Sequence, residues 1–309
     1  MRRRSVAALV IVAASLGMPP SADAAFPGDD GLIAFAYETS VPGENLTQND
    51  IYVIAADGSG RTQLTRTPFR HEFAPAWSPD GARIAFWRTK APFGSGSIWT
   101  MAADGSDPVR LTSAVDARDP AWSPNGRRIV FTLFDGAGAP DIATMRAVDG
   151  GGRRRLTRWK SHDFEPAWSP DGTTIAFTRG FELGDVGDVW TIDLATDHAT
   201  RLTSSPGYDH QVSWSPDGSL IAFERVTGAV TAKIMSIAAD GTPLRQLTSG
   251  HFDADPAYAP TGDTIVFASD RQGSFFPDLW VMRSDGVDAV RVVDLPGAST
   301  GPDQQPRPG

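Results

Sequence analysis

The chain has 309 residues, 40% of them hydrophobic and 21% charged, which suits one large or two ordinary globular domains. Its formal net charge is −9, so it is a poor candidate for a nucleic-acid-binding protein, which needs a basic face. It has no cysteine, which excludes disulfides and a thiol-linked lipid anchor.

The first 24 residues have the pattern of a secretory signal peptide. Three arginines at positions 2–4 precede an apolar run over residues 6–18, and Ala22-Asp23-Ala24 fits a small-residue cleavage signal. The apolar run is too short to span a membrane. We therefore predict Sec-type export to the periplasm or the exterior, cleavage after Ala24 and no transmembrane segment in the mature protein. The mature chain, residues 25–309, has 25 basic and 36 acidic residues.

One motif, PAWSPDG followed by an IAF-like run, recurs along the mature chain. It occupies residues 75–86, 120–131, 166–177, 212–223 and 256–267. Its aromatic anchors are spaced 45, 46, 46 and 44 residues apart and are Trp77, Trp122, Trp168, Trp214 and Tyr258. A fixed period in the forties is typical of a repeat architecture. We expect the anchors to be core residues.

Each repeat reads as four short strands. In the unit from residue 163 to 203 these are 166–169, 174–178, 188–192 and 200–203, with a Pro-Asp-Gly turn after the first. Four antiparallel strands about every 45 residues form one propeller blade. We therefore predict an all-β, six-bladed β-propeller over residues 25–309. The expected blades are approximately 27–72, 73–117, 118–163, 164–209, 210–253 and 254–309.

The first blade lacks a first strand of its own, because residues 31–35 already read as a second strand. We predict that about residues 303–308 pair beside them and close the ring. Asp303 and Gln305 would then take the places that lie three residues and one residue before the motif elsewhere. Two prolines in this segment cannot donate to a ladder, so a frayed tail and a three-stranded first blade are the alternative.

The repeat resembles that of the TolB family. The shared pattern is x-x-D-x-x-P-x-W-S-P-D-G-x-x-I-A-F, then I-Y-V-M-x-x-D-G and R-L-T, over about residues 27–295. The resemblance implies a propeller that binds a protein or peptide in the cell envelope. TolB itself also has an N-terminal α/β domain, whereas we expect the propeller of this chain to start directly after the signal peptide, without that domain. Similar propellers precede the hydrolase domain of prolyl-oligopeptidase-like enzymes, but no G-x-S-x-G nucleophile motif occurs here, so we do not expect an enzyme.

Acidic residues and histidines gather just before each motif. We expect them in the loops around the mouth of the central channel. The candidate partner-binding residues are Glu72, Asp119, Asp163, Glu165, Asp209, His210, Asp253 and Asp255. In one interpretation the carboxylates cap backbone N–H groups of their own turn or of a neighbouring blade. In the other they form a negative funnel for a cation, a basic peptide or a polar ligand.

An alternative function is a metal-assisted polysaccharide lyase or hydrolase. Its candidate ligands are His162, His210 and His251, although none has the local spacing of a zinc motif. We expect no required cofactor, while a divalent cation in the channel is possible. The variable loops after the second strands carry further candidates for recognition, namely Phe93, Phe134, Phe181, Phe275 and Phe276. We expect a monomer.

Overall fold

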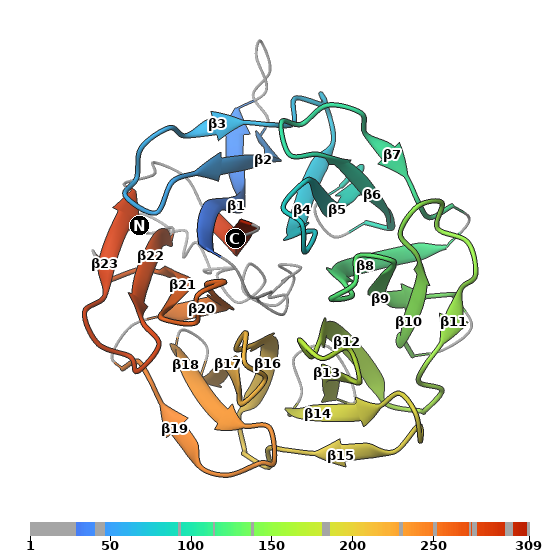
Figure 1. Cartoon of the computed structure of the whole chain (residues 1–309), viewed down its shortest axis with the longest axis vertical. Coiled ribbons are helices and arrows are strands. Elements are labelled where there is room, and N and C mark those ends of the chain that lie inside the picture. Colours follow the sequence, from blue (N-terminus) through green and yellow to red (C-terminus); the bar gives the residue numbers. More distant parts are fainter. Residues whose placement is uncertain are drawn as a thin grey trace, which may run out of the picture.

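The chain folds into six four-stranded antiparallel sheets arranged as blades around one axis (Figure 1). The computed structural model describes residues 29–40, 47–91, 94–113, 115–136, 139–180, 186–228, 231–249, 252–271, 273, 277–293 and 299–307. The predicted six-bladed propeller is therefore confirmed. In the described part of the chain, no helix is long and apolar enough to cross a membrane. The predicted signal peptide lies outside the described residues.

The strands of each blade run from the axis outward. Blade 1 consists of β24 (Ser299–Arg307), β1 (Asp29–Ser40), β2 (Thr47–Ile54) and β3 (Thr62–Gln63). Blade 2 consists of β4 (His71–Trp77), β5 (Arg83–Thr89), β6 (Gly96–Ala102) and β7 (Val109–Arg110). Blade 3 consists of β8 (Asp116–Trp122), β9 (Arg128–Phe134), β10 (Asp141–Arg146) and β11 (Arg154–Arg155).

The other three blades repeat this order. Blade 4 consists of β12 (His162–Trp168), β13 (Thr174–Gly180), β14 (Gly187–Asp193) and β15 (Ala199–Arg201). Blade 5 consists of β16 (Tyr208–Trp214), β17 (Leu220–Gly228), β18 (Thr231–Ala238) and β19 (Leu244–Gln246). Blade 6 consists of β20 (Asp253–Tyr258), β21 (Thr264–Ser269), β22 (Asp278–Arg283) and β23 (Val290–Val293). We call the face at which the first strands begin, and the second strands end, the top face.

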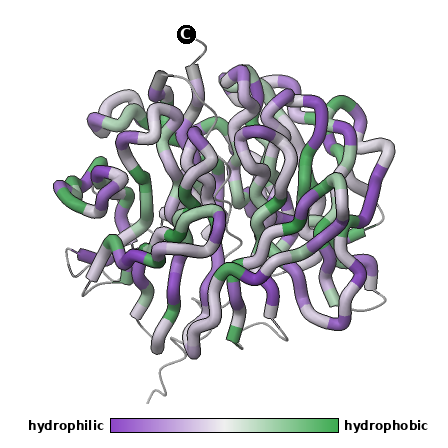
Figure 2. Tube along the Cα trace, turned by 60° about the horizontal axis from the view of Figure 1, so that its bottom comes forward, coloured by the Kyte–Doolittle hydropathy of each residue, from purple (hydrophilic) through white to green (hydrophobic). Residues whose placement is uncertain are grey.

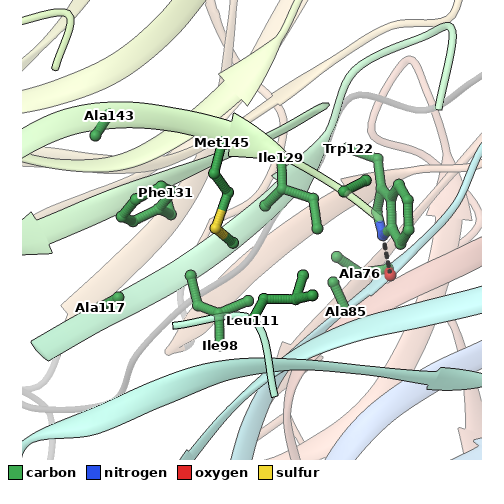
Figure 3. Close-up of a cluster of buried hydrophobic side chains, with 11 residues drawn as sticks. Ala76, Ala85, Ile98, Leu111, Ala117, Trp122, Ile129, Phe131, Ala143 and Met145 are labelled. Atoms are coloured by element: carbon green, nitrogen blue, oxygen red, sulfur yellow. Dashed lines mark hydrogen bonds between the residues drawn. The ribbon is translucent and has the colours of Figure 1, made fainter. Parts of the chain in front are cut away.

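The repeated motif gives each sheet one face of large side chains and one of small side chains. Successive residues of a strand point to opposite faces, so Ala167 and Trp168 diverge, and so do Ala176 and its neighbour Phe177. The large face of one blade then packs on the small face of the next. In the cluster between blades 2 and 3, the large side chains of blade 3 cover Ala76 and Ala85 (Figure 3).

Each of the six contacts between neighbouring blades has a buried apolar cluster of this kind in the described residues. The anchors Trp77, Trp122, Trp168, Trp214 and Tyr258 are all buried there, as predicted. Along the strands, short polar and apolar segments follow one another (Figure 2). The hydrophobic core is therefore divided among the blade interfaces, and no single blade could bury both of its faces alone.

The Ser-Pro-Asp-Gly part of the motif builds the hairpin between the first two strands. In blade 4 the Ser169 hydroxyl donates to Asp171 (2.5 Å) and accepts from the Thr174 N–H (3.0 Å). Gly172 has a φ of 74°, a conformation that side chains disfavour. The same serine-to-Asp or serine-to-Asn bond recurs at Ser78, Ser123 and Ser215. The side chains of these motif residues thus stabilise the turn between the first and second strands.

The C-terminal strand β24 lies beside β1 and completes blade 1. Its register differs from the sequence prediction by four residues, because Asp303 pairs with Ala34 and Gln304 with Ile33. Ser299 and Gly301 therefore take the places predicted for Asp303 and Gln305. The physical reason is that Pro302 occupies the place that Pro166 has in blade 4, and Gly301 before it adopts the required positive φ of 56°. Residues 299–307 and 29–40 thus pair in one sheet and complete the four strands of blade 1.

Candidate functional site

The acidic positions before the motif lie inside the first strands. The sequence placed them in connecting loops, but β12 already begins at His162 and β16 at Tyr208. The residue just before the motif has a positive φ of 52–59° in five blades, where the ladder shifts register: Ala74, Asp119, Glu165, Gln211 and Asp255. This bulge turns the two acidic positions of each strand in different directions.

The outer acidic position, three residues before the motif, forms ion pairs within its own blade. Asp163 binds Arg179 through two contacts of 2.7 and 2.9 Å, and Asp209 binds Arg225 through contacts of 2.6 and 2.7 Å. Glu72 pairs likewise with Arg88, and Asp253 with Arg271. All four carboxylates are fully buried. Because an arginine neutralises each one, these positions do not present free negative charge to the top face.

Sequence reasoning missed these arginines, although three of them share a signal. Arg88, Arg179 and Arg225 each stand two residues after the phenylalanine that ends the repeated motif. Their guanidinium groups lie over aromatic rings, as Arg88 does over Trp99 at 4.5 Å. Burial raises the pKa of Glu72 to about 7 although Arg88 opposes the shift.

The inner acidic position, one residue before the motif, links neighbouring blades. The Glu165 carboxylate accepts the Gln211 N–H of blade 5 at 2.7 Å, and the Asp255 carboxylate accepts the Gly301 N–H of blade 1 at 3.0 Å. Asp119 acts through Thr132, whose hydroxyl donates to it (2.8 Å) and accepts the Glu165 N–H (3.1 Å). These contacts correspond to the interpretation in which the carboxylates cap backbone groups of a neighbouring blade.

His210 lies between two carboxylates near the axis. Its Nδ1 is 3.6 Å from Glu165 and its Nε2 is 3.4 Å from Glu224, and neither nitrogen makes a hydrogen bond within the described residues. Burial acts to lower the pKa of His210, but Glu224 and Glu165 outweigh it, so this pKa lies well above its usual value. Burial, together with Glu165, raises the pKa of Asp119 to about 8. Burial and Glu224 raise the pKa of Asp255 to about 7.

His162 and His210, two of the three histidines proposed as metal ligands, belong to no metal-binding group among the described residues. Among the residues that the structure describes, no group of three or more His, Asp, Glu or Cys could hold a metal ion. The ring of His162 is edge-on to Phe164 at 5.7 Å, and His251 lies outside the described residues. The metal role therefore stays a prediction, as does the partner-binding role of the carboxylates.

Exposed aromatic side chains mark the top face. Trp159, in the connection between β11 and β12, is 49% exposed, and Phe69, in the equivalent connection of blade 1, is 55% exposed. The Arg179 guanidinium lies 3.6 Å from the centre of the Trp159 ring, and Trp190 packs edge-on against the same ring. Trp159 is thus held by a buried ion pair below it. Of the predicted loop aromatics, Phe134 lies under Arg118, while the other four lie outside the described residues.

Six four-stranded blades of this repeat define a β-propeller, and residues 115–306 match the family described as the TolB beta propeller domain (PD40). The chain therefore belongs to this family, as its motifs indicated. The crystal structure of TolB from Acinetobacter baumannii is similar, with a TM-score of 0.76 and 22% identity over 90% of this chain and 67% of that one.

More distant propellers share the fold alone. They include hydrazine synthase of Kuenenia stuttgartiensis (TM-score 0.72, 15% identity, 91% of this chain and 47% of that one). An oligogalacturonate lyase in complex with manganese has a TM-score of 0.56 and 14% identity over 88% of this chain and 75% of that one. In sequence, 59 residues are 44% identical to dipeptidyl-peptidase 5 of Porphyromonas gingivalis, which is 18% of this chain and only 8% of that protein.

Proposed function

We propose that this protein is an exported binding module that docks a protein or peptide of the cell envelope on its top face, and acts as a monomer. The observation that carries the proposal is the geometry of Trp159. Tryptophan is one of the residues enriched at the energetic hot spots of protein interfaces, and a side chain that is already rigidly held loses little entropy when a partner covers it. Arg179, Asp163 and Trp190 provide that rigidity.

The arrangement of charges supports docking through aromatic and arginine side chains in place of an acidic funnel. The outer carboxylates are buried and paired, and the inner ones accept backbone N–H groups of the next blade. For the same reason we propose that no metal is required for docking. Elemental analysis of the dialysed protein tests this point, and a stoichiometric metal would contradict it. Export is proposed from the signal-like residues 1–24 and from membership in the family.

Site-specific photocrosslinking in the native cell tests the docking surface. A photoreactive amino acid replaces Trp159 or Phe69 on the top face, and Leu244 or Val290 on the outer strands in the control proteins. All four side chains are substantially exposed, so each variant should fold. We expect one envelope protein to crosslink from both top-face positions and from neither control. Equal crosslinking from all four positions, or none from the top face, would overturn the proposal.

A further inference from the structure

Four blades carry an aspartate at an equivalent position of the third strand, and each time it has a partner on the fourth strand. Arg201 binds Asp188 at 2.5 Å, Arg155 binds Asp141 at 3.0 Å and Arg291 binds Asp278 at 3.3 Å. In blade 1 the Gln63 amide donates to Asp50 at 3.0 Å. These aspartates are buried, at 0–6% exposure. Blade 5 replaces both members of the pair, with Lys233 and Gln246.

Blade 2 keeps the arginine and lacks the aspartate. Ser97 stands where the other blades have Asp, and Arg110 stands where they have Arg201 or its equivalents. The Arg110 guanidinium donates to the Ser97 hydroxyl at 2.7 Å and to the Thr112 carbonyl at 2.7 Å. Neither acceptor carries a charge, so Arg110 has no anion within the described residues. In blades 1, 3 and 4 the threonine equivalent to Thr112 also donates to the aspartate.

Ser97, at the position that holds the aspartate in four other blades, lines a basic pocket of about 200 Å³ on the top face. Its charged lining residues are Arg70, Arg88, Lys90 and Arg110, and no carboxylate of the described residues lines it. Arg88 is paired with Glu72 beneath the pocket. Arg70 and Lys90 make no side-chain ion pair with any described residue, so three cationic side chains lack a counter-charge here. Such a cluster of unpaired cationic side chains is unusual in a chain whose net charge is −9.

We propose that the pocket of blade 2 binds a phosphate group, held by Arg110, Arg70 and Lys90 in the place where four other blades hold an aspartate carboxylate. Guanidinium groups bind phosphate oxygens through paired, charge-assisted hydrogen bonds, and lysine adds a mobile point charge. Three uncompensated cations suit a phosphate, whose charge is about −1.5 to −2 near neutral pH, better than a single carboxylate. The ligand is inorganic phosphate, a soluble phosphate ester or a phospholipid headgroup.

Titration calorimetry near neutral pH and low salt tests the chemistry, with inorganic phosphate as the probe and acetate for comparison. We expect saturable phosphate binding with a Kd of about 1 mM or lower, and acetate at least about tenfold weaker. Sedimentation with phosphatidylcholine vesicles, with and without phosphatidic acid, separates the sources. Binding to phosphatidic acid vesicles identifies a headgroup site, whereas binding to soluble phosphate alone identifies a soluble ligand. No saturable binding to either probe overturns the proposal.

Three variants, each of which lowers the net charge of the protein by one unit, locate the site. Ser97→Asp restores the carboxylate of the other blades beside Arg110, and Arg110→Gln introduces the residue found at Gln63 and Gln246. Both substitutions have precedents within the chain, so both should fold. We expect each to weaken phosphate binding about tenfold or more, since charge-assisted hydrogen bonds are lost. Arg245→Gln on the outer strand of blade 5 is the control. An unchanged Kd in Ser97→Asp, or an equal loss in Arg245→Gln, would refute the assignment.

Discussion

Two buried tryptophans in equivalent positions make it possible to measure how much one hydrogen bond between blades contributes to stability. Trp122 and Trp168 are 4% and 6% exposed and occupy the same position of blades 3 and 4. The Trp122 Nε1–H donates to the Ala76 carbonyl of blade 2 at 3.1 Å (Figure 3). The Trp168 Nε1–H is buried without a partner in the described residues. Replacement of each by phenylalanine removes a similar volume, so the two variants differ mainly in this bond.

We expect Trp122→Phe to lower the free energy of unfolding more than Trp168→Phe does. The lost hydrogen bond costs about 1 kcal/mol net, while removal of an unpaired buried donor relieves a penalty of about 1–3 kcal/mol. The difference between the variants should therefore be about 2–4 kcal/mol.

Guanidinium unfolding followed by circular dichroism measures this difference, provided that the two variants have equal m-values. Circular dichroism avoids the loss of fluorescence that accompanies removal of a tryptophan. Equal midpoints, or a larger loss of stability in Trp168→Phe, would refute the reasoning from hydrogen bonding.

The other predictions concern the axis and the closure of the ring. Burial gives Asp119 and Asp255 folded-state pKa values of about 8 and 7, above the usual value, so the folded state binds protons more tightly than the unfolded state. Protonation of these two carboxyl groups therefore stabilises the folded state. The stabilisation is complete below pH of about 4 and disappears as the pH rises through about 7 and 8. The Tm should fall over that window, and less steeply in Asp119→Asn; identical slopes would contradict this. Removal of residues 299–309 should lower the Tm, because β24 then no longer pairs with β1 and Asp303 no longer accepts the Trp77 N–H. An unchanged Tm after truncation would show that closure by β24 contributes nothing.

The fold was predictable because a blade is a local unit. The period of the anchors, the Pro-Asp-Gly turns and the alternation of Ala with Ile and Phe all act within one repeat. They fix the strand order before any contact between blades is known. The buried position of Trp168 follows from the same alternation.

The directions of the candidate site residues could not be predicted in this way. A positive φ at Glu165 or Asp119 depends on a bulge, which sends two acidic residues of one strand to different partners. The partner of Asp163 is Arg179, 16 residues away, and the partner of Glu165 is a backbone N–H in the next blade. Such contacts arise from the pairing of strands and the packing of blades, so a single repeat does not reveal them.

The register of β24 was mispredicted for a related reason. The segment lacks the tryptophan that marks the first strand elsewhere. The sequence prediction therefore placed Asp303 at the position of Asp163. The structure aligns Pro302 with Pro166 and uses Gly301 for the left-handed residue before it. Backbone conformation was thus a better guide than charge at this position.

The docking proposal is tested most directly by the affinity of the crosslinked partner for Trp159→Ala, measured beside Leu244→Ala as the control. Both side chains are about half exposed, so neither substitution should alter the fold. The proposal predicts a Kd raised about tenfold or more in Trp159→Ala, as for an interface anchor, and an unchanged Kd in Leu244→Ala. An unchanged Kd in Trp159→Ala would contradict recognition through the top face.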